Sequence, residues 1–262
     1  MKTTLIICTY NWEQALEMVL LSVKNQSILP NEVIIADDGS KASTKELIQQ
    51  FQKDFPIPLF YEWHEDDGFR KCKILNQVLR LSKGEYIIQV DGDVVLHPHF
   101  IKDHLANAEK DTFLVGSRVF LDESLTKEAL QKKKIDINLL SKGVKNKLNS
   151  LYLPFLSPFL KQPIKDAKKV VESVRGCNTS YWRKDIFDVN GYDETMTGWG
   201  REDSELAVRF VNKGIKRNRI KFAAIQYHLH HKENSRNRFN INDEILDLSV
   251  KENKTITEHG IK

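Results

Sequence analysis

Residues 86–93 read YIIQVDGD, a largely apolar run that ends in an Asp-Gly-Asp triplet. Such a run, bounded by turn residues, is typical of a buried strand. Gly92 allows the backbone of the triplet to approach a bound group closely. The stretch therefore predicts a central strand with the carboxylates of Asp91 and Asp93 at its C-terminal end.

The strand pattern recurs around this stretch and alternates with helical patterns through the first 120 residues. Strands are expected at 3–8, 32–36, 59–63, 86–90 and 113–116. Helices are expected at 11–25, 43–54 and 70–82, and from residue 98 onward. This alternation predicts an α/β fold, a Rossmann-like mixed or parallel sheet flanked by helices.

Polar clusters stand at the ends of three of these strands, at residues 9–11, 37–40 and 91–93. In sheets of this class, ligands bind beyond the C-terminal ends of the strands. The three clusters therefore predict one site along one edge of the sheet.

The alternation stops at residue 121, and four parts are expected. They are a first half (1–120), a basic and partly helical insert (121–175), a second half of the same domain (176–240) and a polar tail (241–262). The second half contains strand patterns at 177–182 and 221–231 and a helical pattern at 202–212. The tail is expected to be loosely attached.

Composition excludes several classes of protein. With 262 residues, 40% of them hydrophobic, the chain can form a sizeable core and is not expected to be disordered. No apolar run approaches the roughly 18 residues that a membrane span requires, and the N-terminus lacks a signal-peptide pattern. Three widely spaced cysteines suggest neither a disulfide framework nor a zinc site. We therefore expect a soluble protein of the reducing cytoplasm.

Charge is distributed unevenly along the chain. Residues 127–175 contain 12 basic and 4 acidic residues, a net charge of +8, whereas the whole chain carries +4, so the remainder carries −4. A basic insert on a mildly acidic body suggests an anionic partner, either a membrane surface or a nucleic acid.

The Asp-Gly-Asp triplet is also a candidate metal site. Two carboxylates one residue apart suit Mg²⁺ or Mn²⁺, which prefer oxygen ligands and share them with substrate phosphates. The alternative is a solvated Asp-Gly turn. A second acidic pair, Asp37 and Asp38, is expected at the same sheet edge, where repulsion between carboxylates favours a compensating cation.

Taken together, the motifs resemble the family 2 glycosyltransferases of the GT-A fold. The blocks that carry this resemblance are IICTYN (6–11), DDGS (37–40), GEY (84–86) and DGD (91–93). The blocks DGFR (67–70), RGCNTS (175–180) and GWGRED (198–203) resemble bacterial galactosyl- and N-acetylhexosaminyltransferases of that superfamily. The matched blocks run in the family's order from residue 3 to about 236.

The resemblance implies a donor-binding role for the first half of the chain. Nucleotide-pocket residues would be Thr9, Tyr10, Asn11, Asp37 and Asp38, with Asp38 bonding the uracil or ribose. Arg70 and Lys71 would approach the diphosphate or donor sugar, and Asp91, beside Gly92, would contact the ribose or a metal-bound water.

For the second half, the resemblance implies catalysis and acceptor binding. Asp203 would be the catalytic base, and the acceptor would meet Trp199, Gly200, Glu202 and Asn178. A pair of glycines around Trp199 is expected to form a mobile loop that offers a stacking surface to a sugar. Out of context, Glu202 and Asp203 are an ordinary acidic pair at a helix N-terminus.

Asp93 would ligate the metal directly, and a histidine would complete the metal shell. In the sequence YHLHH (227–231), His228 and His230 point the same way if the strand continues through them. Of these two we prefer His230 as the ligand. The expected cofactor is Mn²⁺ or Mg²⁺, because this donor set fits a zinc hydrolase less well.

These inferences favour a metal-dependent, inverting glycosyltransferase. It would move a hexose or N-acetylhexosamine from a UDP-sugar to a hydroxyl of a growing surface glycan, such as lipopolysaccharide or capsule, or of a lipid-linked acceptor. A nucleotidyltransferase acting on a sugar phosphate is one alternative, but it should carry a glycine-rich loop where residues 9–13 read TYNWE. A non-catalytic basic binding protein is another.

The basic insert leaves two interpretations open. It could dock on anionic lipid at the inner face of the plasma membrane, with Phe155, Phe159 and Leu160 entering the interface. It could instead be a solvated excursion that covers the acceptor side. Nucleic acid is not expected, because the aromatic residues of the insert cluster between the basic runs instead of alternating with them.

Overall fold

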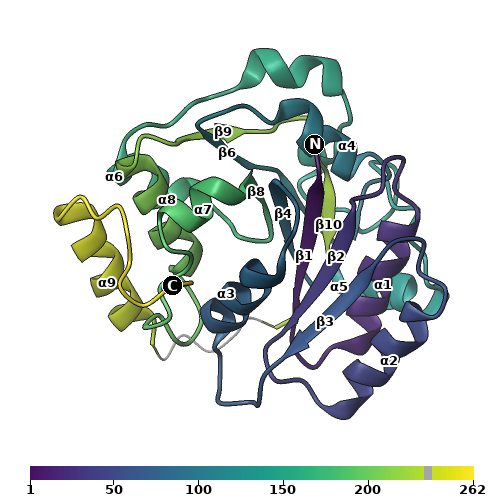
Figure 1. The fold of residues 1–262 in the computed structure, drawn as a ribbon. Helices are drawn as coiled ribbons and strands as arrows, with labels where there is room; N and C mark the ends of the chain where they lie inside the picture. Colours follow the sequence, from purple (N-terminus) through teal and green to yellow (C-terminus); the bar gives the residue numbers. More distant parts are fainter. Residues whose placement is uncertain (233–237) are drawn as a thin grey trace.

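The centre of the protein is a seven-stranded sheet with the order β3-β2-β1-β4-β8-β6-β9 (Figure 1). The computed structural model describes residues 1–232 and 238–262. The strands of this sheet are β1 (Thr3–Thr9), β2 (Glu32–Asp37), β3 (Leu59–Trp63), β4 (Tyr86–Asp91), β6 (Thr112–Val115), β8 (Asn178–Trp182) and β9 (Lys216–Arg219). The prediction of a Rossmann-like α/β fold with a mixed sheet is confirmed.

One strand, β8, makes the sheet mixed. It runs antiparallel to β4 and β6, whereas β1 is parallel to β2 and β4. The chain enters β8 from the edge where β1, β2 and β4 end, and it must therefore cross the sheet in the opposite direction. This reversal places the residues just before β8 beside the predicted site.

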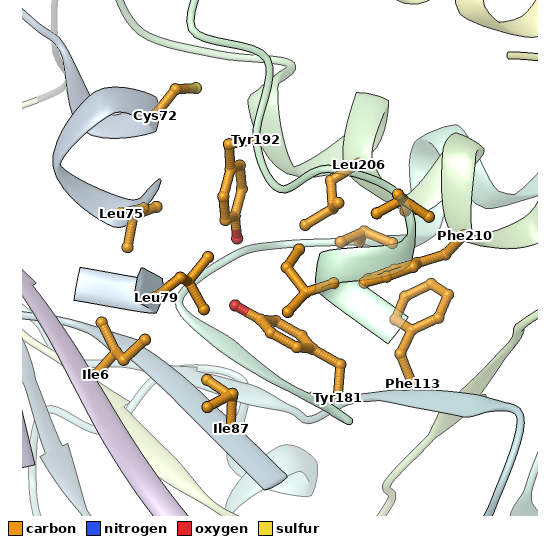
Figure 2. Packing of buried hydrophobic residues seen from close by; sticks show 14 of the residues in the cluster. Ile6, Cys72, Leu75, Leu79, Ile87, Phe113, Tyr181, Tyr192, Leu206 and Phe210 are labelled. Carbon is orange, nitrogen blue, oxygen red and sulfur yellow. The ribbon is translucent and has the colours of Figure 1, made fainter. Parts of the chain in front are cut away.

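Alternate side chains of β1 enter two different cores. Ile6 belongs to a cluster with α3 (Lys71–Leu81) and α8 (Glu202–Asn212), part of which Figure 2 shows. Leu5 and Ile7 belong to a second cluster with α1 (Glu13–Lys24) and α2 (Ala42–Gln52). Successive side chains of a strand point to opposite faces of the sheet, so a strand buried on both faces contributes to two cores. Helices accordingly cover the sheet on both sides.

A smaller sheet, in the order β5-β10-β7, brings the C-terminal half of the chain to the Asp-Gly-Asp triplet. Its strands are β5 (Val94–Leu96), β7 (Arg118–Phe120) and β10 (Gln226–His228). His228 pairs with Val94, and the Leu229 N–H donates to the Asp93 carbonyl over 2.9 Å. The strand expected at 221–231 is therefore much shorter, and the chain leaves it at His228.

The basic insert is irregular and partly helical, as expected. It contains α5 (Glu123–Lys132), η1 (Lys147–Ser150), η2 (Pro154–Leu160), α6 (Ala167–Val170) and η3 (Val171–Ser173). The η2 turn packs on α4 (Phe100–Asn107), where the Ser157 hydroxyl bonds the Asn107 side chain. α4 ends just before β6 begins, so η2 lies toward the N-terminal edge of the parallel strands. Within the described residues, no helix is both long and apolar enough to cross a membrane.

The expectation of a loosely attached polar tail is wrong. Residues 239–251 form α9 (Phe239–Lys251), which packs on α8 at the left of Figure 1. Asn242, Leu246 and Ser249 are buried, and their spacing of four and three residues places them on one face of the helix. The polar composition of the segment concealed this short amphipathic pattern. A further helix, α7 (Arg183–Asp188), follows β8.

We predict that Leu246→Ala destabilises the protein by about 2–5 kcal/mol, because it leaves a cavity in the α3–α8 core. The matched substitution Leu248→Ala, at a side chain that is 46% exposed, should cost only about 0.5 kcal/mol. Urea denaturation followed by circular dichroism measures both free energies of unfolding. Equal, small effects would show that α9 is not anchored as described.

Candidate active site

The ends of three strands meet at one edge of the sheet. Thr9 at the end of β1 is in register with Asp37 of β2, and Cys8 is in register with Asp91 of β4. The Asp38 N–H donates to the Thr9 carbonyl, and the Gly92 N–H donates to the Cys8 carbonyl. The three predicted polar clusters are thus brought together.

The two aspartates after β2 have different surroundings. Asp37 is fully buried and accepts hydrogen bonds from the Ser40 N–H (2.8 Å) and the Tyr61 hydroxyl (2.9 Å). Asp37 therefore holds the turn in place. The Asp38 carboxylate accepts the Arg70 N–H at 3.0 Å and lies 2.8 Å from the His64 ring. Burial raises the pKa of Asp38, and these hydrogen bonds oppose that rise.

The loop after β1 is tied to the loop after β2. Asn11 has a left-handed backbone (φ 47°) and binds Ser40 through its N–H and the Lys41 N–H through its side-chain oxygen. Tyr10 is 52% exposed, and its hydroxyl donates to Asp66 over 2.9 Å. The two loops form one surface that carries an exposed aromatic ring. The sequence predicts that the nucleotide binds at this surface.

Lys71, the first residue of α3, is a buried cation among carboxylates. Its Nζ lies 3.1 Å from Asp91 Oδ1 and 3.8 Å from Glu202 Oε1. Burial lowers the pKa of Lys71, but the negative charges of Asp91, Asp203 and Glu202 outweigh burial, and the pKa lies well above its usual value. Lys71 therefore links the predicted donor residue Asp91 to the acidic pair of α8.

The acidic pair opens α8, where the sequence predicts a helix N-terminus. Asp203 Oδ2 accepts the Gly176 N–H over 2.9 Å, while its buried Oδ1 has no hydrogen-bond partner among the described residues. Burial raises the pKa of Asp203 despite the attraction of Lys71. Burial and the charge of Asp203 raise the pKa of Glu202 to about 7.

Gly176 is required where it stands. A Cβ atom at this position would lie 2.1 Å from both carboxylate oxygens of Asp203. The glycine lets the main chain before β8 reach the carboxylate and donate its N–H to it.

Asp93 meets two histidines in an arrangement that fits a divalent cation. One ligand atom each from Asp93, His228 and His231 lies within 4.8 Å of the others. Nε2 of His231 is 3.1 Å from Asp93 Oδ2, and Nε2 of His228 is 3.6 Å from Asp93 Oδ1. Asp93 Oδ1 is buried and has no hydrogen-bond partner within residues 1–232 and 238–262.

Both imidazoles are oriented by the main chain. Nδ1 of His228 lies 2.8 Å from the Leu229 carbonyl, and Nδ1 of His231 lies 2.6 Å from the Lys232 carbonyl. A carbonyl only accepts, so each Nδ1 carries a proton, and each Nε2 is the ring atom that faces Asp93 and that a bound cation would meet. The three side chains therefore fit the predicted Mn²⁺ or Mg²⁺ as ligands.

The structure does not support the preference for His230. The His230 side chain is exposed, and the main-chain N–H of His230 donates to Thr126 Oγ1 over 2.8 Å. Strand alternation would have aligned it with His228, but β10 ends at His228 and the irregular chain that follows brings His231 to Asp93 instead. The sequence carries no signal for that strand end.

The predicted acceptor residues divide into two groups. Trp199, Gly200 and Glu202 lie together, since the Gly200 N–H donates to Glu202 Oε2 over 3.1 Å. Asn178 does not face an acceptor. Its buried side chain donates to the Ser117 and Ala224 carbonyls and lies 3.0 Å from the His104 ring.

Sequence reasoning missed His64 and Gly176, which hold Asp38 and Asp203. His64 directly follows β3, the strand beside β2, and its position at a strand end was an available signal. Gly176 stands in a quoted block, but its contact with Asp203 depends on the antiparallel direction of β8.

The mixed α/β sheet flanked by helices matches the fold of the GT-A glycosyltransferases. The family model for glycosyl transferase family 2 matches residues 4–168, and that described as the N-terminal domain of galactosyltransferase matches residues 163–232. The chain belongs to glycosyl transferase family 2, and it is an enzyme of the glycosyltransferase type.

Similar proteins agree with this assignment. The chain is 27% identical to the chondroitin synthase of Escherichia coli over 86% of its own length, and it spans about a third (34%) of that relative. Staphylococcus aureus TarS, residues 1–349 with UDP, has a TM-score of 0.63 at 17% identity, covering 95% of this chain and 65% of that one. The Pyrobaculum calidifontis mannosyltransferase PcManGT with GDP-Man and Mn²⁺ has a TM-score of 0.58 at 18% identity, covering 88% and 58%.

We predict that His231→Ala weakens Mn²⁺ binding by at least about tenfold, since loss of even an outer-shell partner costs 10–100-fold in other metal sites. His230→Ala is the matched control and should bind Mn²⁺ like the wild type, because its exposed side chain is not part of the cluster of Asp93, His228 and His231. Isothermal titration with Mn²⁺ measures both affinities. A larger loss in the His230 variant would contradict this assignment.

Proposed function

We propose that the protein transfers a hexose or N-acetylhexosamine from a UDP-sugar to a hydroxyl of a growing glycan, with inversion and with a divalent metal. The observation that carries this proposal is the position of Lys71, which contacts Asp91 on the donor side and Glu202 on the acceptor side. The family and the neighbour that holds UDP support it. The name of the chondroitin synthase relative supports a polysaccharide acceptor.

The donor would lie across the strand ends. The nucleoside would rest on the loops that carry Tyr10 and Asp38, and the diphosphate would extend toward Lys71 and Asp93. Asp93, His228 and His231 would hold the metal, which when bound neutralises the charge that develops on the departing UDP. Arg70 is half-exposed at the N-terminus of α3, where it can reach the same anionic group.

Asp203 would act as the base. One of its oxygens is held by Gly176, so the other is left to accept a proton from the acceptor hydroxyl as that oxygen attacks the anomeric carbon. Its burial raises its pKa toward neutrality, which strengthens it as a base. The helix N-terminus favours the ionised form, which is the form that a base requires.

We predict that Asp203→Asn lowers UDP release from the preferred UDP-sugar by about 100-fold or more, because it removes the base. UDP affinity should change by less than about twofold, since the carboxylate lies on the acceptor side. Coupled detection of UDP, with Mn²⁺ or with EDTA, measures turnover, and isothermal titration measures UDP binding.

The matched control is Asp188→Asn, which removes a surface carboxylate paired with Lys184. It should leave both UDP release and UDP affinity unchanged. Full turnover in the Asp203 variant would exclude Asp203 as the base. A wild-type protein that neither binds UDP nor hydrolyses any UDP-sugar would exclude the proposed donor.

We also propose that the insert binds an anionic membrane surface. Phe155 and Phe159 of η2 are 67% and 84% exposed, and Lys165, Lys168 and Lys169 are exposed shortly after them. Exposed aromatic side chains beside lysines suit an anionic lipid interface. Because η2 lies toward the edge of the sheet opposite the site, this contact would anchor the enzyme without covering the acceptor.

Flotation with vesicles of phosphatidylcholine, with and without phosphatidylglycerol, measures this contact. The wild type should float only with the anionic vesicles, and Phe155→Ser/Phe159→Ser should remain at the bottom. Absence of the wild type from anionic vesicles at low salt would exclude docking.

A further inference from the structure

The loop before α8 is held by a helix that both family models leave out. The models match residues 4–168 and 163–232, whereas α9 begins at Phe239. Asn242 of α9 donates to the Gly200 carbonyl over 2.9 Å and to the Thr197 carbonyl over 3.3 Å. From the other side, the Gly198 N–H donates to the Phe69 carbonyl over 3.0 Å. The loop is thus fixed between α9 and the chain just before α3.

The two glycines of this loop serve close packing, which differs from the mobile loop expected from the sequence. A Cβ atom at Gly198 would lie 2.9 Å from Arg238 Cβ, and one at Gly200 would lie 3.0 Å from the Phe239 ring. Both glycines also have positive φ angles, 78° and 108°. The Phe239 ring in turn stacks with Trp199, with 6.5 Å between ring centroids and 26° between planes.

Arg201 joins the loop to α8 in a conformation that needs support. Its φ angle is 76°, in the left-handed region that residues with a Cβ atom rarely adopt. Its Nε lies 2.7 Å from Asp243 Oδ1, and its guanidinium lies 4.8 Å from the centre of the Phe239 ring. A weaker contact of 3.4 Å joins it to Glu172. Two of these three partners belong to α9.

α9 also holds α8 itself. The Ser249 hydroxyl donates to Glu205 Oε1 over 2.9 Å, and Glu205 forms a fully buried ion pair with Arg209. The helix therefore contacts both the loop that carries Trp199 and the helix that carries Asp203.

We propose that α9 is part of the acceptor side of the site, with Asp243 and Arg201 as positioning residues. Their ion pair fixes the left-handed turn, and that turn sets Trp199 and Asp203 relative to each other. This inference rests on the proposed function, in which Trp199 meets the acceptor sugar and Asp203 removes its proton. Neither Asp243 nor Arg201 needs to touch the substrate.

The test compares Asp243→Asn with Asp247→Asn, which makes the same change at an exposed position of the same helix. Amide hydrogen exchange of residues 197–203 should become faster in the Asp243 variant only. The kcat for UDP release from the UDP-sugar should fall about tenfold in the Asp243 variant, because small displacements of a reacting group slow the reaction strongly. UDP affinity and melting temperature should match those of the Asp247 variant, and Asp243→Glu should restore turnover.

The outcomes separate the two proposals. A wild-type protein without UDP binding or turnover would overturn the proposed function, while the exchange measurement would still test the contact. Equal exchange at 197–203 in the two variants would overturn the inference. Faster exchange with normal turnover would overturn it as well. If the melting temperature and all kinetic constants of the Asp243 variant fell together, the role of Asp243 would be merely structural. That result would also overturn the inference.

Discussion

The site depends on one buried ammonium group. Lys71 lies among the carboxylates of Asp91, Glu202 and Asp203, which would otherwise repel one another in a largely buried region. Removing one partner of a buried ion pair typically costs about 3–5 kcal/mol, because the remaining charge stays unpaired. The cation at the start of α3 is thus what allows the acidic end of α8 to dock against the end of β4.

Chain direction explains why these groups meet. The parallel strands β1, β2 and β4 deliver their polar ends to one edge, whereas β8 starts from that edge and delivers Gly176 there. The short β10 runs antiparallel to β5 and brings His228 back to Asp93. Segments far apart in sequence therefore bring Asp38, Asp93 and Asp203 to one edge of the sheet.

The parts that sequence could predict are those governed by local periodicity. The alternation of buried strands and helices gives the sheet, and the polar residues at the strand ends give its functional edge. His231 could not be preferred over His230, because the last residue of a three-residue strand depends on tertiary pairing. The attachment of α9 was hidden for a similar reason, since only Leu246 among its three fully enclosed side chains is apolar. The role of Gly176 required knowing that β8 runs antiparallel.

Glycine illustrates how the same residue type can mislead when it is read locally. Two glycines around Trp199 suggest mobility, because glycine widens the range of accessible backbone conformations. In the folded protein that range is used instead to admit Phe239 and Arg238 at distances a side chain would forbid. Close packing then removes the freedom that glycine offers, and the loop acquires a defined shape from a helix 40 residues downstream along the chain. A loop of this kind takes its conformation from tertiary contacts, so the shape of the chain before α8 depends on residues that no local motif contains.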